Sequence, residues 1–113
     1  MNIDWTFRGE ALDDGMQERI NQHLGKLARF LRDPADAHVV VAYKGPTHQI
    51  VDLEVVLTSP DGTFTGRDEG HDIAEVAREV LRRVEAQAQK SHDKRREGRR
   101  QGGLPELAID EEV

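Results

Sequence analysis

The chain has 113 residues, the usual size of one compact domain, and it contains no cysteine, which excludes disulfides and thiolate chemistry. Its 16 basic and 22 acidic residues give a net charge of −6, and an acidic average argues at first against nucleic-acid binding. It has neither a run of about 18 apolar residues nor the basic and apolar segments of a signal peptide, so we expect a soluble, cytoplasmic protein.

The N-terminal third predicts a strand and a helix. Residues 2–7 alternate apolar and polar side chains with the period of a half-buried strand. Asp13 or Asp14 is placed to cap a helix that ends near Arg32, before the helix-breaking Pro34. The apolar face of this helix has spacings of three and four residues: Met16, Ile20, Leu24, Leu27 and Leu31.

The middle of the chain predicts three further strands. A strand over residues 37–44 is followed by a glycine–proline turn and by a strand over residues 48–58. A tight turn at residues 60–62 leads into a short strand over residues 63–67, so the last two strands are expected to form a hairpin.

The last predicted element is a helix from His71 or Asp72 to near Glu97. At 1.5 Å per residue it would be roughly 40 Å long, which exceeds the length of a small sheet, so its C-terminal third should project. Residues 1–97 are thus predicted as the folded domain and residues 98–113 as a disordered acidic tail. The apolar face of the helix is formed by Ile73, Val76, Ala77, Val80, Val84 and Ala88.

This order of elements predicts an α+β fold, β-α-β-β-β-α, with both helices on one face of a mostly antiparallel four-stranded sheet. The first two strands can be parallel neighbours joined by a right-handed crossover, or they can lie at opposite edges. The crossover rule favours parallel neighbours.

Charge is unevenly distributed along the chain. Residues 1–77 have a net charge of −7, residues 78–100 of +5, and residues 101–113 of −4. Exposed charges further apart than the Debye length, about 8 Å at physiological salt, interact weakly. A local basic block is therefore able to bind phosphate although the average is acidic.

The basic block lies on the last predicted helix. Arg83, Lys90 and Lys94 are spaced close to one stripe, and Arg78, Arg82, Arg95 and Arg96 broaden it. One interpretation is a solvated helix end whose cations complement the helix dipole. The other is RNA binding, and the density of cations slightly favours it. Because Trp5 and Phe7 are expected in the core, contacts should be with phosphate and sugar, not with stacked bases.

Catalysis is weakly supported. The five histidines are scattered without metal-ligand spacing, and no P-loop, nucleophile elbow or dinucleotide fingerprint occurs. Asp52 and Glu54 share one strand face and could act as an acid–base pair, although solvated surface residues are the simpler interpretation. We therefore expect no catalytic residues, no metal, no cofactor and no small-molecule substrate.

Several segments match one protein family in order and spacing. They are Lys26–Phe30, Asp36–Val41, His48 before Val51–Val55, Gly62, Asp72, and the basic spacing Arg83, Lys90, Lys94. Together they span nearly all of residues 1–96 and resemble the ribosome hibernation promoting factors and ribosome-associated inhibitor A proteins, of the sigma-54 modulation type. The length resembles the short forms, which lack a second, dimerising domain.

The resemblance implies a fold similar to double-stranded RNA-binding domains, docked on the 30S subunit between head and body. There it would contact 16S rRNA in the 30S subunit or the 70S ribosome and sterically block tRNA and mRNA during stress or stationary phase. It implies RNA contacts by Lys26, Arg29, Arg83, Lys90 and Lys94, which would form a clamp between the two helices, and the basic block adds Arg82 and Arg95.

Two positions depart from the family pattern. Ala74 replaces a frequent aromatic residue and Ala86 a basic one.

The alternative function is a protein-binding regulator without direct ribosome contact, in which the acidic N-terminal portion would bind a basic partner.

Overall fold

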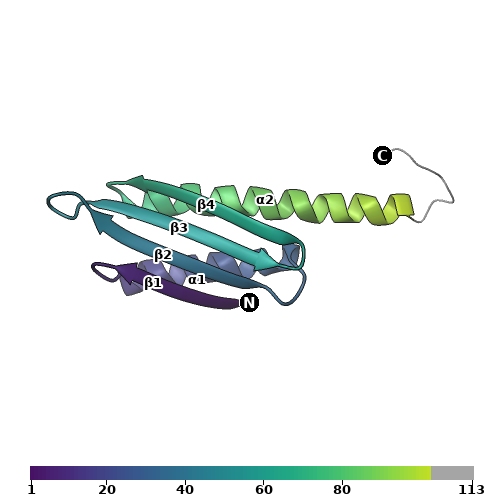
Figure 1. Ribbon diagram of the computed structural model, residues 1–113, viewed down its shortest axis with the longest axis horizontal. Helices are drawn as coiled ribbons and strands as arrows, with labels where there is room; N and C mark the ends of the chain where they lie inside the picture. Colours follow the sequence, from purple (N-terminus) through teal and green to yellow (C-terminus); the bar gives the residue numbers. More distant parts are fainter. Residues whose placement is uncertain (103–113) are drawn as a thin grey trace.

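The computed structural model describes residues 1–102, with side chains through residue 96. The elements occur in the predicted order (Figure 1). They are β1 (Asn2–Arg8), α1 (Asp14–Leu27), the 3-10 helix η1 (Ala28–Phe30), β2 (Asp36–Lys44), β3 (Ile50–Ser59), β4 (Gly62–Gly70) and α2 (Ile73–Gly102).

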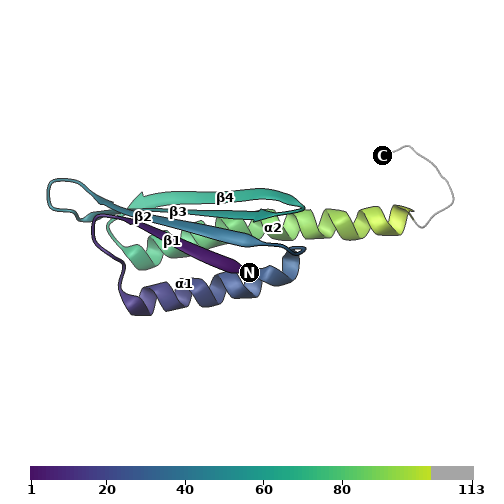
Figure 2. The ribbon, with the colours of Figure 1, turned by 60° about the horizontal axis from the view of Figure 1, so that its bottom comes forward.

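The sheet has the strand order β1-β2-β3-β4, and both helices lie on one of its faces (Figure 2). β1 and β2 are parallel, whereas β2–β3 and β3–β4 are antiparallel. This confirms the predicted α+β fold and the prediction that the first two strands are parallel neighbours.

Three boundaries differ from the predictions by three or more residues. α1 ends at Leu27 and tightens into η1 instead of continuing to Arg32, although Leu31 still reaches the core from an extended backbone. β4 continues to Gly70 because its polar residues pair along β3 as an edge strand. α2 continues to Gly102, past the predicted end near Glu97. The rest of the predicted tail, residues 103–113, lies outside the described residues.

One hydrophobic core lies between the sheet and the helices. α1 contributes Ile20, Leu24 and Leu27, which are almost completely buried. Both helices begin at aspartate caps, and the cap of the first was predicted: the Met16 amide donates to the Asp13 carboxylate at 3.1 Å, and the Ala74 amide donates to Asp72 at 2.9 Å. The remaining core residues come from β2, β3, β4 and α2, together with Leu12, Leu31 and Ala35 from loops.

α2 approaches β4 most closely at Gly66. A Cβ atom at this position would lie 2.7 Å from the Val80 carbonyl oxygen and 3.1 Å from the Val84 side chain. The missing side chain therefore allows the helix backbone to rest directly on the strand. Beyond this contact α2 continues past the end of the sheet, as predicted (Figure 1).

Gly66→Ala tests this close approach. The added methyl group would force α2 away from β4 and should lower the free energy of unfolding by about 1–3 kcal/mol. Gly25→Ala is the matched control, because its Cβ would meet nothing within 4 Å and alanine in a helix is favoured over glycine by about 0.5–1 kcal/mol. Urea denaturation measures both variants, and equal stabilities would contradict the packing described.

Candidate nucleic-acid interface

α2 lies between the edge strand β4 and helix α1. On one side, the Gln87 amide bonds the Thr65 main chain of β4 at 3.1 and 2.8 Å, and Arg83 donates to the Arg67 carbonyl. On the other side, Glu85 lies 3.1 Å from His23 of α1. We call these two sides of α2 the β4 flank and the α1 flank.

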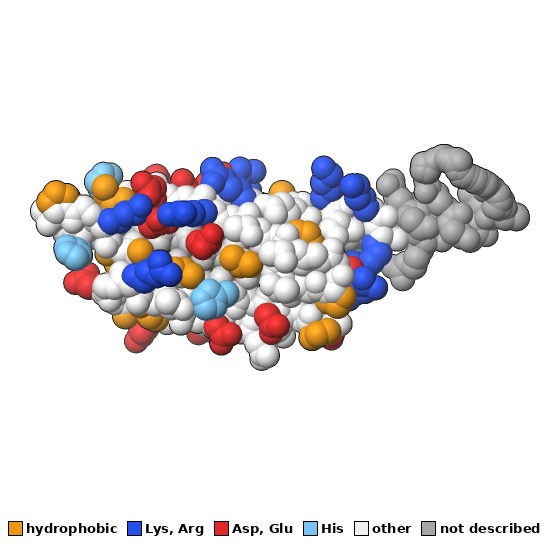
Figure 3. Space-filling model, viewed as in Figure 1, with side chains coloured by type: hydrophobic (Ala, Val, Ile, Leu, Met, Phe, Trp, Pro, Cys, Tyr) orange, Lys and Arg blue, Asp and Glu red, His pale blue; other side chains and the backbone are white. Residues whose placement is uncertain are grey.

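The β4 flank carries the basic stripe predicted from the sequence. Lys90 and Lys94 follow Gln87 by about one and two helical turns, so they lie on the same side as Arg83 and Gln87. Arg83 and both lysines are exposed. Figure 3 shows Lys and Arg side chains along this edge and on the projecting part of α2.

Two of the predicted RNA-binding arginines are held by an acidic neighbour. Arg82 and Arg83 donate to the Glu79 carboxylate at 2.6 and 2.7 Å. These hydrogen bonds lower the pKa of Glu79 from its ordinary 4.5 to about 2. Glu79 is therefore ionised at neutral pH and offsets part of their charge. Lys90 and Lys94, by contrast, pair with no acidic side chain among residues 1–96.

Lys26 and Arg29 are exposed at the end of α1 and in η1. The Arg29 guanidinium lies 4.7 Å from the centroid of the Phe30 ring, and Phe30 meets His92 of α2 edge to face at 5.6 Å. These cations therefore lie beside the α1 flank, with α2 between them and the lysines of the β4 flank. A ligand contacting both sets would have to reach around α2, which differs from a clamp on one surface.

Arg95 is tied into the fold by Asp61, in the turn between β3 and β4. Its Nη1 donates to Asp61 Oδ2 at 2.7 Å, and its side chain is 24% exposed. The Asp61 side chain is 4% exposed and also accepts from Arg32 Nε at 2.7 Å and the Arg32 amide at 3.2 Å. Burial would raise the pKa of Asp61, but the hydrogen bonds from Arg32 and the charges of Arg95 and Arg32 together lower it. This Asp61 cluster joins the base of the projecting helix to the end of the sheet.

Asp61→Asn tests the cluster. The substitution keeps the side-chain shape but removes the charge that makes both arginine contacts strong, so the melting temperature should fall. Amide hydrogen exchange should also accelerate over residues 88–96 of α2, because this segment loses its anchor to the sheet. Differential scanning calorimetry and hydrogen-exchange mass spectrometry measure these two effects.

Asp36→Asn is the control, since Asp36 is exposed and forms no ion pair with the side chains of residues 1–96. The lowered pKa of Asp61 also fixes the sign of its pH effect. Its contribution is present above the ordinary carboxyl pKa of about 4 and is lost as pH falls through the native value. Acidification should therefore destabilise the wild type more than Asp61→Asn, and identical pH profiles would argue against the cluster.

Asp52 was predicted to be a solvated surface residue, but in the structure it is buried. It is 8% exposed, accepts two bonds from Arg67 at 3.1 and 2.6 Å, and lies 3.2 Å from Lys44. The Arg67 bond is the main cause of its lowered pKa. Its partners come from neighbouring strands, so its burial could not be inferred from the alternation along β3.

The open face of the sheet offers little for catalysis. The cavity beside Asp52 and Glu54 has a volume of about 110 Å³, well below the roughly 300 Å³ of typical small-molecule sites. Among the described residues, no group of three or more His, Asp or Glu side chains is arranged to hold a metal ion. Neither described helix is long and apolar enough to cross a membrane.

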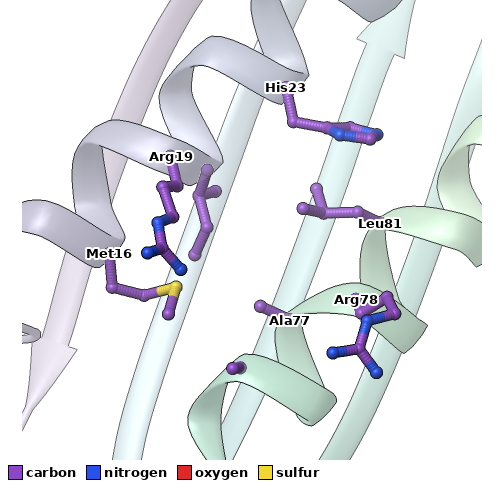
Figure 4. Close-up of a pocket in the computed structure, with 8 residues that line it drawn as sticks. Met16, Arg19, His23, Ala77, Arg78 and Leu81 are labelled. Carbon is purple, nitrogen blue, oxygen red and sulfur yellow. The ribbon is translucent and has the colours of Figure 1, made fainter.

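Sequence reasoning did not single out Arg19, which lies with Arg78 at a groove between α1 and α2 (Figure 4). Arg19 precedes Lys26 by about two helical turns, so it belongs to the same face of α1. Arg78 was included only as a broadening member of the basic stripe. Their relation was not visible in the sequence, because the two residues come from different helices.

Residues 3–96 match the family described as sigma 54 modulation protein / S30EA ribosomal protein. The fold is similar to the N-terminal domain of Protein Y from Thermus thermophilus, with a TM-score of 0.69 and 22% identity over 80% of this chain and 98% of that chain. It is also similar to a ribosomal subunit interface protein from Coxiella burnetii, with a TM-score of 0.64 and 16% identity over 80% of this chain and 96% of that chain.

No curated protein matches the sequence significantly. The two solved structures share too little sequence with this chain to establish more than its fold. The family match, in contrast, extends from the first strand to the basic part of α2. The chain therefore belongs to the sigma 54 modulation protein / S30EA ribosomal protein family, whose members are ribosome-associated factors and not enzymes.

Proposed function

We propose that this protein is a cytoplasmic hibernation factor that binds the small ribosomal subunit and inhibits translation in stress or stationary phase. It contacts 16S rRNA in the 30S subunit and in the 70S ribosome, near the decoding centre. The observation that carries the proposal is the pair Lys90 and Lys94, whose charges are not offset by any acidic side chain of residues 1–96, in a family of ribosome-associated factors.

The mechanism is steric. α2 extends beyond the sheet as a rod (Figure 1). Exposed cations lie on or beside both of its flanks, an arrangement suited to a narrow passage between RNA surfaces. Lys90, Lys94 and Arg83 contact phosphates on the β4 flank. Lys26 and Arg29 contact phosphates beside the α1 flank. A rod held in this way occupies space that tRNA and mRNA need, so no chemical step is required.

Arg82, Arg83 and Arg95 have secondary roles in this proposal. Arg82 and Arg83 both pair with Glu79 and therefore bind phosphate less strongly than an unpaired lysine. Arg95 orients the projecting helix through its ion pair with Asp61. Its partly buried side chain therefore contributes to the position of the helix more than to direct phosphate binding. The strongest contacts are thus assigned to Lys90 and Lys94.

Lys90→Glu with Lys94→Glu tests the proposal. Each reversal removes a phosphate contact and introduces repulsion, so 30S affinity in sedimentation assays should fall by ~100-fold or more. Arg8→Glu is the control for a single reversal, because Arg8 lies on the open sheet face, away from both flanks. It should reduce affinity far less than Lys90→Glu or Lys94→Glu alone.

Salt dependence provides the second readout of the same experiment. With about five phosphate contacts and a slope near −0.7 per contact, a fourfold rise in monovalent salt should weaken wild-type binding by roughly two orders of magnitude. Salt-insensitive binding, or full binding by the double reversal, would contradict the proposal. A protein-binding regulator predicts no 30S association in either form.

A further inference from the structure

The groove between α1 and α2 combines an apolar floor with two cations. Its volume is about 220 Å³, smaller than the roughly 300–1,000 Å³ of sites for drug-sized ligands. Met16, Ile20 and Leu81 form part of the floor. The short side chains of Ala74 and Ala77 leave the space open on the α2 side.

Arg19 and Arg78 line this groove from opposite helices. Both are exposed, and neither forms a hydrogen bond or an ion pair with the side chains of residues 1–96. The lining contains no acidic residue. At one end, His23 lines the groove and pairs with Glu85 at 3.1 Å. Two unneutralised guanidinium groups around one small cavity favour an anionic ligand.

The groove continues the cations on the α1 flank. Arg19 and Lys26 lie on the same face of α1, about two turns apart, and Arg29 follows in η1. On α2, Arg78 and Arg96 lie on the same side five turns apart, about 27 Å along the helix axis. Cations thus occur both at the groove and beyond the His23–Glu85 pair. One RNA strand that runs along the two helices would therefore contact the groove arginines and the cations beyond the pair.

We propose that this groove receives one unstacked nucleotide of the bound RNA. The base enters between the helices against the apolar floor, and Arg19 and Arg78 bind the phosphates on either side of it. The inference rests on the proposed function and adds a site that reads RNA shape through a base exposed from its stack. Arginine suits this role because its planar guanidinium both binds phosphate and stacks on a base.

The size of the groove favours a nucleotide over a peptide. An amphipathic peptide helix is recognised through several anchors at successive turns, which requires an elongated apolar surface. Here a single small cavity is bounded by cations, and the His23–Glu85 pair bridges the two helices beside it. An anion with one compact apolar group matches this arrangement.

The test compares 30S affinity among groove variants whose folding is verified by thermal melting. Arg19→Gln and Arg78→Gln should each weaken binding about 3- to 10-fold, and the double variant more, because each loses a phosphate contact. Ala74→Phe should weaken binding by this chain, because it fills the cavity without changing the charge; the cavity depends on Ala74, where the family pattern frequently has an aromatic residue. The matched controls are Arg8→Gln, on the open sheet face, and Ala86→Phe, at an exposed position of α2 outside the groove.

A direct probe uses uridine and adenosine monophosphates in NMR titrations of the wild-type protein. The methyl resonances of Ala74 and Ala77 should shift on titration, and those of Ala86 should not. Wild-type affinity in all four groove variants, with 30S binding by the wild type intact, would overturn the inference and leave the proposed function standing. Absence of 30S binding by the wild type would overturn the proposed function itself. The same variants can be tested for binding to an acidic peptide. If they lose peptide binding but keep wild-type affinity for 30S subunits, the groove belongs to a protein partner and the inference is overturned.

Discussion

The direct contact of α2 with β4 at Gly66 determines how the whole basic surface is arranged. Because no side chain separates strand and helix, the Val80 carbonyl rests on the sheet. This contact fixes the rotation of α2, so that Gln87 reaches the β4 main chain and Glu85 reaches α1. Because the helix is rigid, the rotation set at this contact also fixes the direction of the later side chains, including the cations beyond the end of the sheet.

Acidic residues then sort these cations into two groups. Glu79 and Asp61 together hold Arg82, Arg83, Arg95 and Arg32, and these arginines shape the surface more than they charge it. The cations without acidic partners among residues 1–96 remain available to an anion. The acidic average of the chain is therefore compatible with RNA binding, since part of the negative charge is used in pairs that orient the basic surface.

Sequence reasoning predicted what depends on local periodicity and missed what depends on partners from other elements. Apolar spacing indicated both helices and the first three strands, the tight turn at residues 60–62 indicated the fourth strand, and the crossover rule indicated the parallel pair β1–β2. The burial of Asp52 was missed because Arg67 and Lys44 reach it from adjacent strands. The Asp61 cluster and the pairing of Arg19 with Arg78 at one groove were missed for the same reason. The family resemblance indicated the ribosome as the binding partner, because periodicity alone specifies no partner.

The open sheet face completes the electrostatic argument. On this face Lys44 and Arg67 are paired with Asp52 and Glu69. Arg8 also lies there without an ion pair among residues 1–96, but Glu54 lines the same cavity, so the face offers phosphate little excess of positive charge. Among residues 1–96, the other Lys and Arg side chains without ion pairs lie on α1, η1 and α2, on the helical side and along the β4 edge. An RNA surface would therefore attract the helices and not the sheet, which sets the orientation of the protein before any close contact forms. Charge placement, and not total charge, directs how this fold approaches an anionic partner.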